Sequence, residues 1–186
     1  MAKYILASQS PRRKQLLIWA ELEFDIIVPD TDESFPAGST PAEAAVYIAK
    51  QKAQAVISSL KEDHIIIAAD TIVVLENAII GKPADRNQAI QILTQLSGKT
   101  HHVITGVAIK DKGHSITFYD QTEVEFHPLT QEQIVFYVDK YQPYDKAGAY
   151  AIQEWIGVIG IKCINGDFYN VMGLPVSRVM QALQTF

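Results

Sequence analysis

Asp70 is the residue of this sequence whose position most needs a chemical explanation. It is a single carboxylate that separates two apolar runs, residues 65–69 and residues 71–75. Burying an ionised carboxylate without partners costs free energy, so such a residue has a structural or functional reason to be there. Either it caps a bulge or a strand end, or it serves a reaction site, and the residues alone leave both interpretations open.

Two arginines follow a short strand predicted at residues 3–7. Ser10 is a favoured N-cap and Pro11 suits the first helical position, so a helix is expected to begin there. Arg12 and Arg13 then lie at the positive end of the helix dipole, where cations are unfavourable and a bound anion would offset the cost. The pattern indicates anion binding by free N–H groups and two guanidinium groups. Two surface arginines on a capped helix are the alternative.

A polar loop at residues 29–39 carries the carboxylates Asp30, Asp32 and Glu33. Three carboxylates in a short span can repel one another, stay solvated, or share a divalent cation through oxygen ligands. The spacing alone favours a solvated loop. Lys52 follows in the next predicted helix, and a lysine on a helix is ordinarily a solvated charge.

The elements that must position these groups alternate between strands and helices. Asn77 lies in a polar turn that makes a hairpin of the central strands, and residues 100–110 and 115–126 predict a second, longer hairpin. Capped helices are expected at residues 40–60, 85–96 and 130–141, and a last helix ends near residue 185. The predicted fold class is α/β, with a mixed, strongly twisted sheet and flanking helices.

Composition excludes several classes of protein. The net charge of −5 argues against general binding to nucleic acids or anionic membranes, and 48% hydrophobic residues supply a core. The single cysteine, Cys163, excludes an intramolecular disulfide, and its apolar surroundings predict a buried thiol. No apolar run is long enough for a membrane span or a signal peptide, which predicts a cytoplasmic protein. No glycine-rich fingerprint supports a Rossmann or P-loop nucleotide site.

Eight short motifs occur in one order along the chain. They are ASQSPRR (7–13), Asp32-Glu33, KQKA (50–53), AADT (68–71), GKP (81–83), SGKTHHVITGV (97–107), DKAGAYAIQ (145–153) and NVMGLP (170–175). Together they resemble the Maf family of nucleoside triphosphate pyrophosphatases. The resemblance implies a single Maf-like domain over residues 1–186, with two lobes around a central cleft as in the related inosine triphosphate pyrophosphatases. It also implies hydrolysis to a monophosphate and pyrophosphate with a divalent metal cation, Mg²⁺ or Mn²⁺.

One subgroup of this family hydrolyses dTTP and UTP, and the sequence resembles it at three places. They are the arginines of the SPRR loop, Thr71 directly after the AAD aspartate, and Gln153 at the end of the KAGAY stretch. The sequence departs from the family pattern at Ala151, where glycine is common, and at Trp155 and Ile156, where smaller residues are common. We expect Trp155 to shape the base pocket.

The resemblance, together with the chemistry that the reaction needs, assigns a role to each candidate residue. Asp70 is the catalytic base, and Glu33 and Asp70 are the oxygen ligands of the metal. Gln153 offers an amide that matches the O4 and N3–H edge of uracil or thymine, and Thr71 also selects the base. The residues assigned to the triphosphate are Ser8, Arg12, Arg13, Lys52 and Lys82.

The sequence therefore predicts a dTTP/UTP pyrophosphatase. Two alternatives stay open: the same chemistry on modified pyrimidine nucleotides or CTP, and a nucleotide-sensing protein that affects septum formation. The intact carboxylates and lysines disfavour pure sensing, because a binder does not need a base or a metal site. The expected partner is a nucleoside triphosphate, with no nucleic acid and no membrane. The family resemblance alone suggests a homodimer.

Overall fold

The computed structural model describes residues 3–186 and divides the chain into two compact units. Unit 1 consists of the described part of Met1–Thr71 together with Thr105–Asp120 and Gly173–Phe186, and unit 2 consists of Ile72–Ile104 and Gln121–Met172. The chain therefore passes between the units four times. A single domain over residues 1–186 stays a prediction, and its first two residues lie outside the described range.

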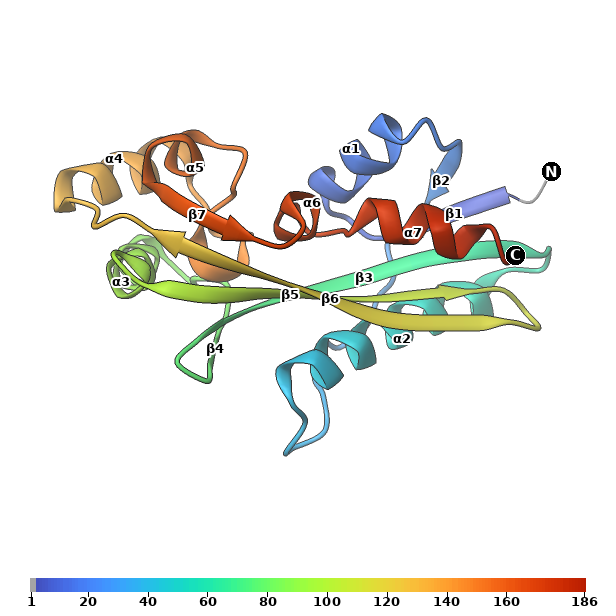
Figure 1. Cartoon of the computed structure of the whole chain (residues 1–186). Helices are drawn as coiled ribbons and strands as arrows, with labels where there is room; N and C mark the ends of the chain where they lie inside the picture. The colour runs from blue at the N-terminus through green and yellow to red at the C-terminus, as the bar shows by residue number, and fades with distance from the viewer. Residues whose placement is uncertain (1–2) are drawn as a thin grey trace. The chain divides into compact units, whose positions relative to one another are not determined.

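The sheet has seven strands, in the order β2-β1-β3-β5-β6-β7, with β4 paired to β3 (Figure 1). β1 is parallel to both of its neighbours, whereas β4 and β7 are antiparallel to theirs. The predicted mixed sheet with flanking helices is confirmed. The strands are β1 (Lys3–Ala7), β2 (Phe24–Ile26), β3 (His64–Leu75), β4 (Ala78–Ile80), β5 (Thr100–Lys110), β6 (Ser115–Phe126) and β7 (Ile161–Asn165).

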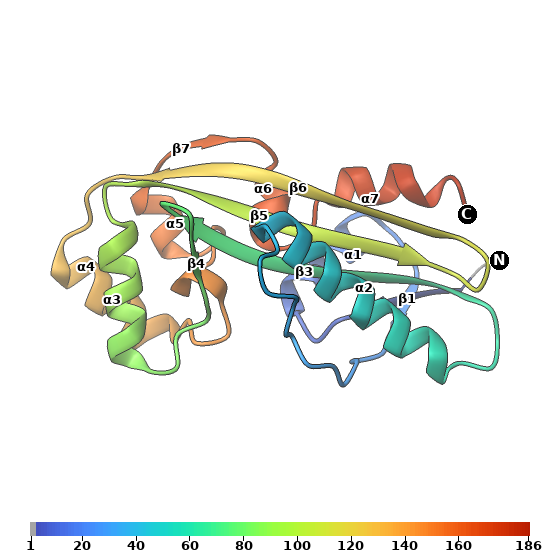
Figure 2. The ribbon, with the colours of Figure 1, turned by 90° about the horizontal axis from the view of Figure 1, so that it is seen from below.

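In unit 1, three helices cover the two faces of the strands. α2 (Pro41–Ser59) lies on one face, and α1 (Pro11–Trp19) and α7 (Val176–Leu183) lie on the other (Figures 1 and 2). Half of the buried residues of α2 are alanines, and Ala49 and Ala53 belong to the core cluster that contains Ile5 and Ile66. Small residues let the helix approach the sheet closely.

Gly106 shows how close this approach is. A Cβ atom added to Gly106 on β5 would overlap the backbone of Ala45 and Val46 in α2. No side chain can move aside to relieve an overlap with backbone, so only glycine fits at this point. The contact fixes how deeply α2 sits on the strands, and therefore where the side chains of α2 emerge.

The predicted helix starts are confirmed by side-chain caps. The Ser10 hydroxyl accepts the N–H of Arg13 at 3.4 Å, and Thr40 and Glu43 form a reciprocal capping box at the start of α2. Asp85 caps α3 (Arg86–Leu96) and Thr130 caps α4 (Gln131–Tyr141). Each cap satisfies backbone donors that the first helical turn leaves without intrahelical partners.

In unit 2, α3 packs beside α4, and a 3₁₀ turn at Ala147–Ala149 follows. The apolar run at residues 155–164 forms a short helix, α5 (Trp155–Gly160), followed by β7, and residues Phe168–Met172 form the helix α6. Apolar runs this short fit a helix and a strand equally well by periodicity.

Cys163 was expected to be buried, and it is exposed. It lies on β7, which the strand order places at the end of the sheet, paired with β6 alone. An end strand covered on few sides leaves side chains in solvent even when its sequence is apolar. Separately, no helix within residues 3–186 is both long enough and apolar enough to cross a membrane.

Candidate functional site

The parallel pairing of β1 and β3 builds the core of the site. Ala7, the last residue of β1, pairs with Ala68 of β3. Beyond this pair the chain leaves β1 through the Ser8 loop into α1, while β3 continues to Asp70 and Thr71. The carboxyl end of a parallel strand is where α/β sheets commonly bind ligands. Two motifs that are about sixty residues apart in sequence are thereby brought side by side in unit 1.

Lys52 lies between two carboxylates. Its Nζ is 2.7 Å from Oε1 of Glu33 and 2.7 Å from Oδ1 of Asp70. The side chains of Lys52 and Asp70 are only 10% and 14% exposed, whereas that of Glu33 is 47% exposed. The carboxylate of Asp70 is thus held in a fixed place by a largely desolvated ammonium. This arrangement answers the question that its sequence position raised, because Asp70 lies within a strand and is paired with a cation.

The burial of Lys52 follows from its place on α2. It shares a helix face with Ala45, Ala49 and Val56, which are buried against the strands, whereas Lys50 points to solvent. The two lysines of the KQKA motif are two residues apart, which is roughly half a turn of a helix with a period of about 3.6 residues, so they lie on opposite faces. The sequence-based interpretation of Lys52 as a solvated charge gave too little weight to this period.

Arg13 is buried, and its guanidinium donates three hydrogen bonds. Nε donates to the carbonyl of Gly173 at 2.7 Å, Nη1 to Ser8 Oγ at 3.3 Å, and Nη2 to Thr71 Oγ1 at 2.9 Å. Burial lowers the pKa of Arg13 below its ordinary value, and the nearby charge of Asp70 partly opposes this shift. The neighbouring Arg12 is half-buried and has interactions of its own.

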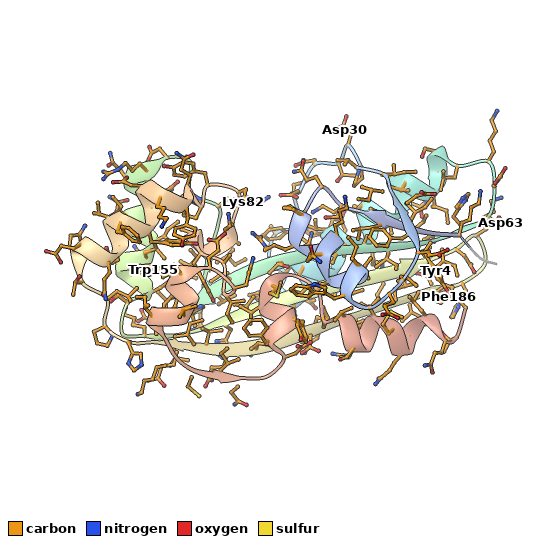
Figure 3. The ribbon with its side chains drawn as sticks, turned by 90° about the horizontal axis from the view of Figure 1, so that it is seen from above. Tyr4, Asp30, Asp63, Lys82, Trp155 and Phe186 are labelled. Atoms are coloured by element: carbon orange, nitrogen blue, oxygen red, sulfur yellow. The ribbon has the colours of Figure 1, made fainter. Side chains whose placement is uncertain are left out.

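Lys82 and Gln153 belong to unit 2. Lys82 is exposed on the loop that follows β4, next to Gly81, whose carbonyl accepts the N–H of Gly148 at 3.2 Å (Figure 3). This bond joins the GKP motif to the KAGAY stretch. Gln153 is exposed, and Trp155, at the start of α5, packs edge-on against Phe136 with ring centroids 4.8 Å apart. The predicted site residues thus form two groups, one in each unit.

Tyr137 is a residue that sequence reasoning missed. Its hydroxyl accepts the N–H of Ala151 at 3.2 Å and donates to Oε2 of Glu154. It therefore contacts the backbone before Gln153 and the side-chain carboxylate of the residue after it. In the sequence Tyr137 looks like part of the apolar face of α4, where it is indeed fully buried. A tyrosine hydroxyl at a core position needs a polar partner, and that requirement was the available signal.

The residues of unit 1 fit a divalent metal of the Mg²⁺ type. Glu33 and Asp70 present two carboxylates close enough to share the ammonium of Lys52. Within residues 3–186 no group of three or more His, Cys, Asp or Glu side chains is placed to hold a metal. Mg²⁺ commonly binds through one or two carboxylates, substrate phosphates and water, so two carboxylates are sufficient protein ligands.

Comparison with known proteins gives a likeness in fold and close relatives in sequence. A HAM1 protein from Coxiella burnetii shares the fold, with a TM-score of 0.53 and 18% identity over the full length of both chains. Proteins named dTTP/UTP pyrophosphatase are far more similar. One from Parabacteroides distasonis is 47% identical over 99% of this chain and 96% of its own length. One from Bacillus cereus is 48% identical over 100% of this chain and 96% of its own length. The family model described as Maf-like protein matches residues 3–186, and the chain belongs to the Maf family.

Proposed function

We propose that this chain is a hydrolase that converts dTTP and UTP to their monophosphates and pyrophosphate. The observation that carries the proposal is the ammonium of Lys52 held between the carboxylates of Glu33 and Asp70. A desolvated carboxylate beside cations suits proton abstraction next to a bound phosphate. The relatives named dTTP/UTP pyrophosphatase, similar over nearly their whole length, support the same activity and the same bases.

In the proposed reaction a water oxygen attacks the α-phosphorus. The bond from this phosphorus to the oxygen that bridges to the β-phosphate breaks, and pyrophosphate leaves with the electron pair. Asp70 takes the proton of the water. Lys52 binds Oδ1 of Asp70, so we assign the other carboxylate oxygen to the water. Lys52, Arg12 and Lys82 neutralise charge on the phosphates.

We assign a divalent cation, Mg²⁺ or Mn²⁺, to Glu33 and Asp70. When bound, it would polarise the phosphate oxygens and offset charge on the departing pyrophosphate. The protein contributes the two carboxylates and the rigid strand that carries one of them. Lys52 holds both carboxylates close together before the cation arrives.

Base selection is assigned to Gln153 and Thr71. The amide of Gln153 has both a donor and an acceptor, which is what the O4 and N3–H edge of uracil and thymine requires. The exposed position of Gln153 leaves its amide accessible, while Tyr137 fixes the backbone that carries it. A protein that only senses nucleotides does not need the carboxylates of unit 1.

The test is a panel of canonical and modified nucleoside triphosphates with and without Mg²⁺ or Mn²⁺, followed by phosphorus NMR of the products. The expected result is pyrophosphate and a monophosphate from dTTP and UTP, dependent on the cation. Orthophosphate together with a nucleoside diphosphate would refute the proposed position of cleavage. Preference for CTP or a modified pyrimidine would refute the substrate assignment. Nucleotide binding without turnover would favour the sensing alternative.

Two further predictions concern the setting of the enzyme. We propose that it acts in the cytoplasm on free nucleotides, and that it forms a homodimer. Sedimentation analysis of the purified chain tests the second of these, and a single species at the mass of one 20.7 kDa chain would refute it.

A further inference from the structure

Arg13 donates hydrogen bonds to three segments that are far apart in sequence. Its Nη1 reaches Ser8 in the loop after β1, its Nη2 reaches Thr71 on β3, and its Nε reaches the carbonyl of Gly173 before α7. The residue is only 9% exposed. A buried guanidinium is tolerated when it is hydrogen-bonded, and here each of its three nitrogens donates to an acceptor inside the protein.

The acceptors of these hydrogen bonds include residues at which the chain passes from one unit to the other. Thr71, Thr105 and Gly173 each adjoin one of the four passages between unit 1 and unit 2. Arg13 binds Thr71 and Gly173 directly, and Thr71 Oγ1 lies 3.0 Å from Thr105 Oγ1. One side chain therefore links, directly or through one hydroxyl, three segments of unit 1 at their ends.

Gly173 is suited to this linkage by its backbone. Its φ of +119° is a conformation that side chains disfavour, and it directs the carbonyl toward Nε of Arg13. A Cβ atom at this position would meet Arg13 Nε and Thr71 Oγ1 at 3.6 Å, which is ordinary contact. The glycine is needed for backbone conformation and not for space.

We propose that Arg13 is a positioning residue that fixes Thr71 and, through the adjoining backbone, the carboxylate of Asp70, and that it is not a ligand of the triphosphate. Each of its three nitrogens donates to an internal acceptor, so turning the guanidinium toward a phosphate would break bonds that hold the site together. Arg12, the half-buried neighbour, is then the arginine left for the phosphates. The inference rests on the proposed function, because it concerns where the base of that reaction is held.

The decisive variant is Arg13→Lys, because lysine keeps the positive charge but lacks the planar arrangement of guanidinium N–H donors. Lysine serves well as a point charge toward phosphate, so a phosphate ligand would tolerate the exchange. A positioning residue would not, since one ammonium cannot replace the planar fork that reaches Ser8, Thr71 and Gly173. We expect kcat to fall at least tenfold, while the Kd of a non-hydrolysable UTP analogue changes less than threefold. Gly173→Ala removes no cation. It should also lower kcat while leaving the Kd of the analogue nearly unchanged.

Lys14→Gln is the matched control, because Lys14 is the exposed next residue of α1 and should leave kcat and Kd unchanged. All variants are assayed well below their melting temperatures. A tenfold rise in Kd for Arg13→Lys with kcat retained would overturn the inference, as would unchanged kinetics in both respects.

Hydrogen exchange separates this inference from the proposed function. Faster exchange around Thr71 in Arg13→Lys, but not in Arg12→Lys, supports the positioning role even if the protein hydrolyses none of the nucleotides tested. Exchange that is unchanged around Thr71 contradicts the positioning role even if dTTP and UTP prove to be the substrates.

Discussion

The ammonium of Lys52 touches Oδ1 of Asp70 at 2.7 Å and Oε1 of Glu33 at the same distance. Two carboxylates thus share one counter-ion that is itself largely withdrawn from water. Without that ammonium the two carboxylates would repel each other, and Asp70 would no longer be held in a fixed position.

Lys52→Met keeps most of the length of the side chain and removes the charge. We expect kcat to fall about 10²–10³-fold, which is the usual effect of losing one preorganised electrostatic partner at a reacting centre. Steady-state kinetics on UTP provide the measurement. Lys50→Met, at an exposed position of the same helix, is the control and should retain full activity. Equal activity of the two variants would contradict the role of Lys52.

Asp70→Asn keeps the shape of the side chain and removes its charge. The variant cannot take the proton of the water, so kcat should fall about 10²–10⁴-fold. Calorimetric binding of UTP should survive better, because Arg12, Lys52 and Lys82 keep their charges. Asp63→Asn, just before the start of β3, is the control. A variant that keeps more than about a tenth of wild-type kcat would contradict the assignment of Asp70 as base.

Gln153→Ala removes the amide that is assigned to the base edge. Discrimination between UTP and GTP, measured as the ratio of kcat/KM values, should weaken by about 1–3 kcal/mol. Gln95→Ala, an exposed position on α3, serves as the control. If the ratio does not change in the Gln153 variant, Gln153 does not read the base.

Tyr137→Phe removes only the hydroxyl that holds Ala151 and Glu154. Loss of these bonds should reduce the free energy of unfolding by about 1–2 kcal/mol and shift base discrimination toward that of Gln153→Ala. Tyr141→Phe is the control, because Tyr141 stacks on Tyr137 from the same helix. Discrimination at the wild-type level in Tyr137→Phe would show that Gln153 is positioned by other contacts.

His101 gives a prediction about stability at acid pH. It is fully buried on β5 with Nε2 2.7 Å from the hydroxyl of Tyr150, and burial lowers its pKa from 6.5 to about 4. Between these two values the unfolded chain binds a proton that the folded chain does not. Stability therefore falls as pH drops through this window, by about 3 kcal/mol in all.

Urea unfolding of wild type and His101→Gln across this window measures the effect. The difference in the free energy of unfolding between the two proteins should narrow as pH falls from 6.5 toward 4, because the variant has no histidine to protonate at this position. A difference that stays constant over the window would refute the role of His101.

Local signals predicted much of the fold. Ser10, Thr40, Asp85 and Thr130 each cap a helix where the sequence places a cap, and the Glu76-Asn77 turn closes a hairpin as expected. These features depend on interactions within a few residues, which a single sequence displays. The region after residue 153 was harder, because the short apolar run that begins at Trp155 has no period long enough to separate helix from strand.

The sequence named members of the candidate site but not their arrangement. The sequence indicated Ser8, Arg13, Glu33, Lys52 and Asp70, and unit 1 brings all five together. Which cation pairs with which acceptor depends on the register of β1 against β3 and on the depth of α2. Both are tertiary properties, so the spacing that places Lys52 on the buried face of α2 does not reveal its pairing with Glu33 and Asp70, and the internal bonds of Arg13 could not be read from spacing at all.

The four passages of the chain between the units have a consequence for experiment. Each unit is assembled from separate stretches of sequence, so no single cut in the gene releases one of them whole. A truncation from either end removes part of Asp70's unit before it reaches Gln153's unit, so it would report only on folding. The roles assigned to Asp70 and to Gln153 can be separated by point substitution, or by circular permutation that preserves every passage of the chain between the units.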